Sequence, residues 1–341
     1  MKVAIGHKLQ EGPYGGGNAF VSNLARALQE RGDVVTFDLK DDDIDIILMT
    51  DPRWRSPNVS FAAAKILRYV TFRNPKALVV HRINECDERK HTRTMNFRLR
   101  TANYCADHTV LVGSWLKNLR ILHPALDKAL SVILNGGNTD IFHSKGNKPW
   151  DHQGPLRLVT HHWGYHWLKG FDVYTKLDAM LGEDKWKNKI AFTYIGNLPK
   201  NFEFRNTNYV KPMSGNPLAD ALRRNHVYLT GSVNEPGGNH QVEGGLCGLP
   251  LIYRNSGCMP EYCDGFGVMF DDADIEPALE KMLADYDAYL ARMSDFPHTA
   301  DKTTAAYVRL FDDMLSQREM YVKRRRERKS FWHFLLNQLP Y

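Results

Sequence analysis

The chain has 341 residues and a formal net charge of +6 at pH 7, with 43% hydrophobic and 25% charged side chains. These proportions are ordinary for a globular protein and exclude a disordered or collagen-like chain. No apolar run approaches the ~18–20 residues that a membrane span needs, and the opening MKVAIGHKLQ is too short and too polar for a signal peptide. The five cysteines form no Cys-x-x-Cys pair, which is typical of reduced thiols. We therefore expect a cytoplasmic protein of about two domains, each of roughly 150–170 residues.

The first part of the chain alternates strand-like and helix-like segments. A strand that starts at Lys2 is followed by a glycine-rich turn over 12–18. The spacing of Phe20, Leu24 and Leu28 then predicts an amphipathic helix over 19–31, which Gly32 caps. Further strands are expected at 34–39, 44–49, 77–81 and 109–112. This alternation predicts a parallel sheet with crossover helices.

The same alternation starts again after residue 155. Strands are expected at 156–160, 191–195, 227–229 and 251–253, and helices at 171–181 and 242–247. Residues 143–155 are rich in Gly, Pro and polar side chains, which indicates a linker. We therefore expect an α/β chain with two Rossmann-like domains. The expected divisions are an N-terminal domain over 1–148, a second domain over 149–300, a helix over 301–318 that packs back toward the first domain, and a basic tail over 319–341.

The segment 231–252, GSVNEPGGNHQVEGGLCGLPLI, carries the strongest chemical signal in the chain. Glu235 and Glu243 flank a turn that contains Gly237 and Gly238, and a helix of small residues follows. Glycines ahead of a helix let backbone N–H groups approach an anion, and the two carboxylates can accept hydrogen bonds from the hydroxyls of a polyol. The pattern indicates a site for a diphosphate between two sugar-like groups. A surface turn with solvated glutamates is the alternative.

This segment resembles the donor-site signature of the retaining family-four glycosyltransferases, the glycosyl transferases of group 1, which have the GT-B fold. The signature is Ser-x-x-Glu, a glycine-containing turn, a second Glu eight residues after the first and a small-residue helix that ends Gly-x-Pro, and every element stands between Ser232 and Pro250. Other segments resemble the family in the expected order. They are the glycine loop 15–17, the domain-ending segment 134–142, the donor-phosphate lysine in Lys169-Gly170 and the strand end 194–197. The resemblance covers about residues 1–315.

The resemblance implies two Rossmann-like domains that face a cleft, and transfer of a hexosyl or related group from a nucleotide-sugar to an acceptor hydroxyl with retention. It implies that Glu235 contacts the donor sugar, that Glu243 contacts the ribose and that Lys169 neutralises the diphosphate. The other residues expected at the donor are Gly16, Gly17, Gly196, Asn197, Ser232, Gly237, Gly238, Asn239 and His240. No cofactor and no metal ion are expected.

One position departs from the family pattern. The family usually places an arginine five or six residues before its lysine, and here Gly164 or Trp163 stands at that position. A cationic partner for the diphosphate is therefore missing there. The candidate replacements are His161, His162 and Arg157.

Three short patterns point more weakly to other chemistry. His162 and His166 have the i, i+4 spacing of zinc ligands, but the glycine between them favours a loop and the glutamate of an H-E-x-x-H helix is missing. The acidic run 41–45 opens a strand rather than following one, which favours a solvated turn over a metal site. The glycines at 15–17 lack the third glycine of a dinucleotide fingerprint, because Phe20 stands at that position.

His81 ends the predicted strand 77–81, and polar residues follow it. Side chains at the carboxyl end of a parallel strand face the crevice in which open α/β sheets bind ligands. The resemblance also implies a histidine near the reacting sugar at a comparable place. We therefore expect His81 to be catalytic together with Glu235 and Lys169, with a buried structural histidine as the alternative. The residues expected at the acceptor are Arg82, Asn84 and Asp87.

The positive charge is concentrated at the C-terminal end. Residues 318–341 hold seven basic and two acidic side chains, a net charge of +5, so the rest of the chain carries only +1. Basic residues at 323–329 precede Phe331, Leu335 and Leu339, which have helical spacing. The pattern predicts a helix on an anionic membrane surface over 323–339, a basic helix packed on the body of the protein, or a disordered end. No nucleic-acid recognition motif accompanies the basic run, so no nucleic-acid partner is expected.

Taken together, these features predict a glycosyltransferase of polysaccharide biosynthesis that acts on a glycan or lipid-linked acceptor, peripheral to the cytoplasmic face of the membrane. A non-catalytic module that binds nucleotide-sugars or glycans remains an alternative, although the intact Glu235, Glu243 and Lys169 argue against it. An epimerase or hydrolase of nucleotide-sugars with similar architecture is the second alternative.

Overall fold

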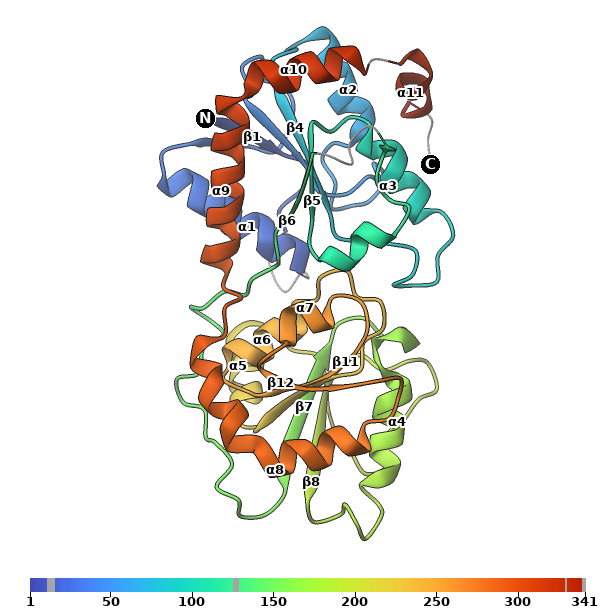
Figure 1. The fold of residues 1–341 in the computed structure, drawn as a ribbon, viewed down its shortest axis with the longest axis vertical. Coiled ribbons are helices and arrows are strands. Elements are labelled where there is room, and N and C mark those ends of the chain that lie inside the picture. The colour runs from blue at the N-terminus through green and yellow to red at the C-terminus, as the bar shows by residue number, and fades with distance from the viewer. Residues whose placement is uncertain (11–15, 125–128, 329, 339–341) are drawn as a thin grey trace. The chain divides into compact units, whose positions relative to one another are not determined.

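The computed structural model describes residues 1–10, 16–124, 129–328 and 330–338, and it divides into two compact units (Figure 1). The first unit contains Met1–Leu134 and Asp301–Tyr341, and the second contains Asn135–Ala300. Each unit is built on a six-stranded sheet whose paired strands all run parallel. The predicted α/β class with two Rossmann-like units is therefore confirmed.

The first sheet has the strand order β2-β1-β3-β4-β5-β6. Its strands are β1 (Lys2–Ile5), β2 (Val34–Thr36), β3 (Ile46–Met49), β4 (Leu78–Ile83), β5 (His108–Leu111) and β6 (Leu130–Val132). The central strands β3, β4 and β5 are buried along their whole length, as strands covered on both faces must be. Five of these strands were predicted; β4, however, continues past His81 to Ile83 and does not end at the histidine.

Helix α1 (Gly16–Glu30) covers this sheet and begins three residues earlier than predicted. Its buried stripe includes Leu24 and Leu28, as the predicted spacing required. The helix ends where Gly32 adopts a left-handed backbone with φ of +90°, and the Asp33 N–H donates to the Leu28 carbonyl at 2.9 Å. Among the described residues, this part of the unit also contains α2 (Ala63–Phe72), α3 (Met95–Asn103) and the 3-10 turn η1 (Ser114–Asn118).

The chain leaves the first unit at Leu134, earlier than the predicted boundary at 148–149. The reason is that Asn135 already bonds to the second unit, where its N–H donates to the Tyr262 hydroxyl at 2.7 Å. Gly136 lies close to the segment at which the chain returns to the first unit, and a Cβ atom at 136 would lie 2.1 Å from the Thr299 carbonyl oxygen. Residues 135–148 therefore belong to the second unit, and only glycine fits at 136.

The second sheet has the order β12-β11-β10-β7-β8-β9. Its strands are β7 (Leu156–His162), β8 (Ile190–Gly196), β9 (Asn208–Val210), β10 (Val227–Thr230), β11 (Leu251–Arg254) and β12 (Gly267–Phe270). Its helices are η3 (Trp167–Lys169), α4 (Phe171–Met180), α5 (Gly215–Arg223), α6 (His240–Leu246), α7 (Met259–Cys263), α8 (Glu276–Arg292) and η4 (Met293–Asp295). The four strands predicted here are confirmed, and α6 starts two residues before its predicted beginning.

The C-terminal residues pack on the first unit through helices α9 (Ala300–Ser316), α10 (Arg318–Glu327) and α11 (Phe331–Leu336). Tyr307 and Phe311 of α9 lie in the core of that unit. In α10, Arg325 forms an ion pair with the buried Asp107 at 2.5 Å, and Arg318 pairs with Asp45 at 2.6 Å. Part of the basic run is thus a packed helix, as one of the predicted alternatives required. No helix in the described ranges is long and apolar enough to cross a membrane.

The Arg325–Asp107 pair gives a stability prediction. The side chain of Asp107 is 1% exposed, so Arg325→Ala leaves a buried carboxylate without the guanidinium that donates to it. We expect a loss of about 3–5 kcal/mol in the free energy of unfolding, measured by urea titration. The control is Arg326→Ala, which replaces the exposed neighbour of Arg325 and should change the free energy of unfolding by less than about 0.5 kcal/mol. Equal effects of the two substitutions would contradict the assignment.

Candidate active site

Two glycines bring the predicted lysine and glutamate segments together in the second unit. Gly170 follows η3 with φ of +100°, and a Cβ atom there would lie 2.6 Å from the Gly231 carbonyl carbon. A Cβ atom at Gly231 would likewise lie 3.1 Å from the Gly170 Cα and 3.0 Å from the Val173 Cβ. The turn after β7 therefore packs directly on the start of the loop after β10. Both loops follow the carboxyl ends of parallel strands, where open α/β sheets bind ligands.

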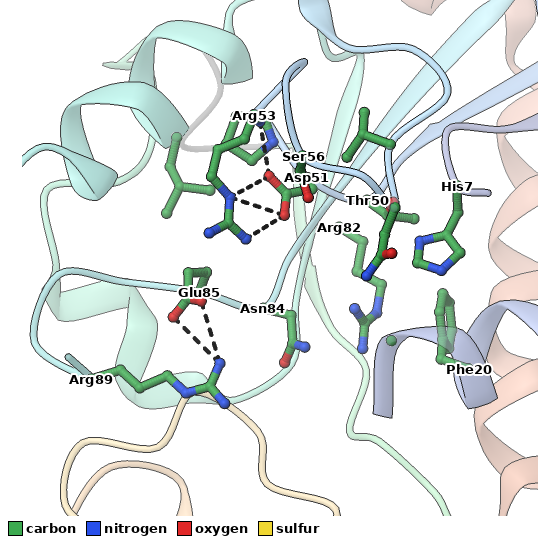
Figure 2. Close-up of a pocket in the computed structure, with 15 residues that line it drawn as sticks. His7, Phe20, Thr50, Asp51, Arg53, Ser56, Arg82, Asn84, Glu85 and Arg89 are labelled. Atoms are coloured by element: carbon green, nitrogen blue, oxygen red, sulfur yellow. Dashed lines mark hydrogen bonds and ion pairs between the residues drawn. The ribbon is translucent and has the colours of Figure 1, made fainter. Parts of the chain in front are cut away.

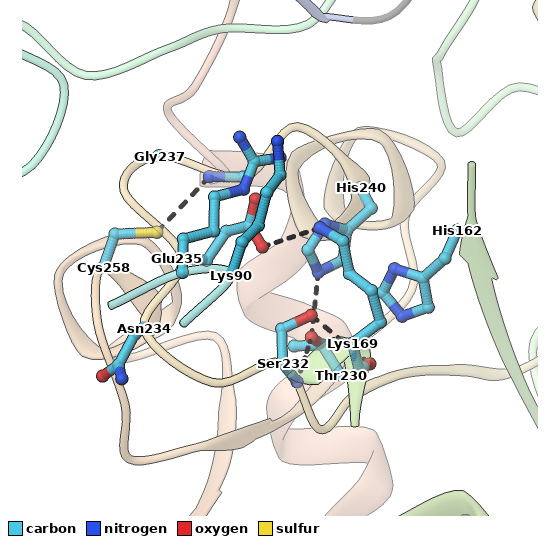
Figure 3. A network of polar contacts seen from close by, with 12 residues as sticks. Lys90, His162, Lys169, Thr230, Ser232, Asn234, Glu235, Gly237, His240 and Cys258 are labelled. Atoms are coloured by element: carbon cyan, nitrogen blue, oxygen red, sulfur yellow. Dashed lines mark hydrogen bonds and ion pairs between the residues drawn. The ribbon is translucent and has the colours of Figure 1, made fainter. Parts of the chain in front are cut away.

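Lys169 and Glu235 meet at this contact as a buried ion pair (Figure 3). The Lys169 Nζ lies 2.7 Å from the Glu235 Oε2, and the two side chains are 7% and 5% exposed. The backbone of Glu235 is held as well, since its carbonyl accepts from the Cys258 N–H at 3.0 Å. Gly257 has φ of +59°, and a Cβ atom there would lie 2.6 Å from the Glu235 nitrogen. Two of the three residues predicted to be catalytic are therefore in direct contact.

In the glycine turn after Glu235, backbone groups that the sequence predicts to face a ligand form hydrogen bonds with other residues of the protein. The Gly238 N–H points at the Cys258 sulfur at 3.4 Å, and the Gly237 carbonyl accepts from the Asn135 side chain at 2.8 Å. Ser232 is fully buried, and its hydroxyl lies 3.5 Å from the Lys169 carbonyl. Helix α6 spans only His240–Leu246, and Asn239 precedes it without capping it through its side chain. The dipole of so short a helix adds little attraction for an anion.

The histidines near this site are hydrogen-bonded to hydroxyl groups. His240 Nε2 lies 2.9 Å from the Thr230 hydroxyl, and His162 Nε2 lies 2.7 Å from the Tyr174 hydroxyl. Burial, together with the neighbouring His240 and Lys169, holds the pKa of His162 well below its usual value, so His162 is neutral. Arg157 lies at the other end of β7, where its Nε donates to the Arg224 carbonyl at 3.0 Å. Neither His162 nor Arg157 replaces the arginine that the family pattern predicts.

Glu243, the second predicted carboxylate, pairs with His161, whose Nε2 lies 2.8 Å from the Glu243 Oε2. Gly196 ends β8 with φ of +151°, and a Cβ atom there would lie 2.1 Å from the His162 carbonyl oxygen. Asn197 follows, and its side-chain amide donates to the Trp163 carbonyl at 2.7 Å. These two residues shape the backbone just after β7. Within the ranges that the structure covers, no three His, Cys, Asp or Glu side chains gather as metal ligands do.

The first unit has its own polar pocket, a cavity of about 180 Å³ at the carboxyl ends of β1, β3 and β4 (Figure 2). The predicted acceptor residues Arg82 and Asn84 line it, and so does Gly17 of α1. The Arg82 guanidinium lies over the Phe20 ring, 4.1 Å from its centroid. Gly16 is the first residue of α1, and Gly15 lies outside the described residues.

Sequence reasoning missed several residues of this pocket. Arg53 makes a forked contact with Asp51, with Nη2 2.5 Å from Oδ2, and Arg89 lies 3.4 Å from Glu85. His7 lies on the opposite wall. Side chains at the carboxyl ends of parallel strands face the crevice that binds ligands, and this holds for β1 and β3 as well as for β4. His7 and Asp51 were therefore detectable as polar residues just beyond predicted strands.

His81 and Asp87 do not line the pocket. His81 lies inside β4 and is fully buried, its Nδ1 is 3.2 Å from the Asn103 amide nitrogen, and burial lowers its pKa to about 3. This geometry favours the structural alternative for His81, because its strand continues two residues beyond it. The Asp87 carboxylate accepts from the backbone N–H groups of Met95 and Asn96 at 2.8 and 3.0 Å. Asp87 therefore holds the start of α3.

No family model and no curated protein matches this chain. Solved structures match its fold over nearly its whole length. HepE of Anabaena in complex with UDP has 12% identity and a TM-score of 0.67, with 92% of this chain and 100% of that chain covered. The catalytic domain of starch synthase IV from Arabidopsis thaliana, bound to ADP and acarbose, has 13% identity and a TM-score of 0.65, with 92% and 99% covered. Sucrose-phosphate synthase from Thermosynechococcus elongatus has 12% identity and a TM-score of 0.62, with 93% and 99% covered. The chain has the GT-B fold that these proteins share, as predicted.

The buried pair predicts a characteristic pattern of stabilities. Glu235→Leu removes the carboxylate from a buried ammonium, and we expect it to lower the free energy of unfolding by about 3–5 kcal/mol. The double variant Lys169→Met/Glu235→Leu removes both charges and should regain most of that loss, as urea titration would measure.

The exposed pair of Lys176 and Asp274, 3.2 Å apart, is the matched control. Lys176→Met/Asp274→Leu and its single variants should each change stability by less than about 1 kcal/mol. If Glu235→Leu alone changes stability no more than the control variants do, the pair is not buried as described.

Proposed function

We propose that the protein is a glycosyltransferase that moves a hexosyl or related group from a nucleotide-sugar to a hydroxyl of a glycan or lipid-linked acceptor. The proposal includes retention of anomeric configuration and catalysis without a metal ion. The observation that carries it is the buried Lys169–Glu235 pair at the carboxyl end of the second sheet, within a segment that resembles the family's donor site. The GT-B fold supports the same conclusion.

The pair is poorly explained by stability alone. Two charges taken out of water lose solvation that their attraction only partly returns, and apolar residues of similar size often stabilise a fold as well or better. A buried lysine beside a carboxylate at the ligand-binding edge of a sheet is therefore better explained by a ligand. HepE was solved with UDP and starch synthase IV with ADP. We infer that a nucleoside diphosphate group also occupies this edge here.

In the proposed reaction, the bond between the sugar C1 and the diphosphate oxygen breaks, and the acceptor hydroxyl oxygen bonds to C1 on the same face. The hydroxyl proton moves to the departing phosphate oxygen. Lys169 stabilises the negative charge that grows on the diphosphate, a preorganised contact of a kind worth roughly 10²–10³ in rate. Glu235 accepts a hydrogen bond from a sugar hydroxyl and holds the Lys169 ammonium in place. Because Lys169 supplies the positive charge, the scheme requires no metal ion.

We assign the acceptor to the pocket of the first unit. Its lining combines the arginines Arg53, Arg82 and Arg89 with the carboxylates of Asp51 and Glu85. Such groups donate and accept hydrogen bonds in several directions, which suits a ligand that carries many hydroxyls. Asp87 and His81 are left out of this assignment, since neither lines the pocket.

A thermal-shift screen with UDP-, GDP-, ADP- and dTDP-sugars tests the donor assignment. At least one nucleotide-sugar should raise the Tm of the wild type, because a ligand at 100 times its Kd stabilises the folded state by about 2.7 kcal/mol. The double variant Lys169→Met/Glu235→Leu should remain folded and show no shift. Lys176→Met, at an exposed site, should shift like the wild type. No shift with any donor, or the same shift in the double variant, would overturn the assignment.

We further propose that the first unit binds an anionic membrane surface through an aromatic patch, defined as Phe72, Phe331, Trp332 and Leu335. Phe72, Phe331 and Trp332 are 77%, 69% and 77% exposed. The Phe334 ring lies edge-on to the Phe72 ring, with centroids 6.2 Å apart, so α11 lies beside the end of α2. Lys323, Arg324 and Arg326 of α10 are exposed. Exposed aromatic and basic side chains on adjacent helices suit the headgroup region of anionic lipids.

Co-sedimentation with vesicles tests this proposal more cleanly than removal of the tail, which would leave Asp107 without Arg325. Phe331→Ser/Trp332→Ser should lower binding to vesicles of phosphatidylglycerol and phosphatidylcholine by about 10-fold or more, since each exposed aromatic contributes burial of apolar area. Trp54→Ser, another exposed aromatic of the first unit, is the control. Equal binding of the double variant, or no preference of the wild type for anionic over neutral vesicles, would defeat the proposal.

A further inference from the structure

We infer that His161 is a positioning residue: together with Tyr228 it fixes the Glu243 carboxylate in the orientation in which it accepts hydrogen bonds from the ribose of the donor nucleotide. The inference deepens the proposed function and rests on it. Neither His161 nor Tyr228 has a role in the family pattern by which the site was recognised from sequence.

The position of Glu243 follows from one close packing contact. Gly244 is the next residue in α6, and a Cβ atom there would lie 2.3 Å from the Tyr228 ring. The backbone of α6 therefore packs directly on Tyr228 of β10, and only glycine allows it. Strand β10 pairs with β7, where Tyr228 lies opposite Val159 and His161 follows towards the carboxyl end. This approach places the Glu243 carboxylate next to the His161 ring.

Tyr228 and Glu243 contact the two different nitrogens of the His161 ring. The Tyr228 hydroxyl lies 3.1 Å from His161 Nδ1, and the His161 backbone N–H donates to the same hydroxyl oxygen at 3.2 Å. Burial raises the pKa of Tyr228 well above its usual value, so the phenol keeps its proton, and its two acceptors are His161 Nδ1 and the His161 carbonyl oxygen at 3.4 Å. Because an ionised carboxylate only accepts hydrogen bonds, His161 Nε2 is the donor in its 2.8 Å contact with the Glu243 Oε2.

This chain of contacts preorganises a carboxylate that remains open to a ligand. The Glu243 side chain is 21% exposed, whereas the His161 side chain is 11% exposed and Tyr228 is fully buried. A free glutamate rotates about three bonds and loses that freedom when a ligand binds, whereas Glu243 is already held through Oε2. An ionised carboxylate has about four acceptor positions, so it can still accept from the two neighbouring hydroxyls of a ribose.

The contact also shows what His161 does not do. The missing family arginine made His161 a candidate cation for the diphosphate. Its Nε2 instead bonds to Glu243 and its Nδ1 lies 3.1 Å from the Tyr228 hydroxyl, so both ring nitrogens are already used. In this chain His161 therefore acts through Glu243 on the ribose, and Lys169 remains the cation for the diphosphate.

Calorimetric titration with UDP, ADP and GDP and with their 2′,3′-dideoxy counterparts tests the inference, since these deoxy forms lack both hydroxyls that Glu243 would bind. The wild type should prefer the ribose form of the diphosphate that it binds, by about 10-fold or more, because a hydrogen bond to a charged group is lost in the deoxy form. In His161→Leu the affinity for the ribose form should fall by about 10-fold, while the affinity for the deoxy form changes little, so the preference approaches one. His161→Gln keeps a side-chain donor and should restore part of the preference.

The outcomes separate this inference from the proposed function. His152→Leu, at an exposed histidine paired with Asp287, is the matched control and should keep the wild-type preference. If His161→Leu weakens the ribose and deoxy forms by the same factor, or changes neither, His161 does not position Glu243 and the inference fails while the donor site stands. The inference also fails if the wild type binds both forms equally. If only dTDP binds the wild type, the inference fails while the donor site stands, and if neither dTDP nor any of the three diphosphates binds, the proposed donor site itself fails.

Discussion

The candidate site depends on one buried ion pair, that of Lys169 and Glu235. It forms only because three glycines allow backbone to pass close to backbone: Gly170 against Gly231, and Gly257 against the Glu235 nitrogen. Side chains at Gly170 or Gly231 would push the loop after β7 away from the loop after β10, and a side chain at Gly257 would displace the backbone of Glu235. The two charges would then be exposed to water, and an ammonium in water attracts a phosphate far less strongly than an ammonium that is preorganised in a buried site. The proposed chemistry therefore rests on local backbone geometry within one unit.

The residues considered in place of the family arginine leave Lys169 as the cation of the loop after β7. His162 is neutral because it is buried beside cationic and imidazole groups, His161 is committed to Glu243, and α6 is too short to act as a strong dipole. The charge of +6 suggested a basic protein, but the surplus lies mostly beyond residue 317. There Arg325 serves the packing of α10 on the first unit, while exposed basic residues lie close in the chain to the aromatic patch.

The sequence predicted the central strands well because they are buried on both faces and therefore appear as apolar runs, as in β3 and β4. It missed the edge strands β6, β9 and β12: β6 and β9 have no fully buried residue, and β12 has only four residues, two of them buried. Spacing pointed to Glu235 and Glu243, the family resemblance added Lys169, and the structure brings Lys169 and Glu235 into contact. It misplaced His81, since an apolar run does not reveal that β4 continues to Ile83. The contact between His161 and Glu243 was beyond sequence reasoning, because it depends on Gly244 packing against Tyr228.

The most direct test of the central claim is NMR analysis of the products that the wild type forms from its preferred nucleotide-sugar, with and without an extract of cellular glycans and glycolipids. Glycosyl transfer with retention predicts that nucleoside diphosphate is released together with an equal amount of new glycoside, which keeps the anomeric configuration of the donor. Without the extract, the donor should be consumed only slowly. Donor consumption at the full rate without any acceptor, or conversion of the donor to an epimer, would contradict the account.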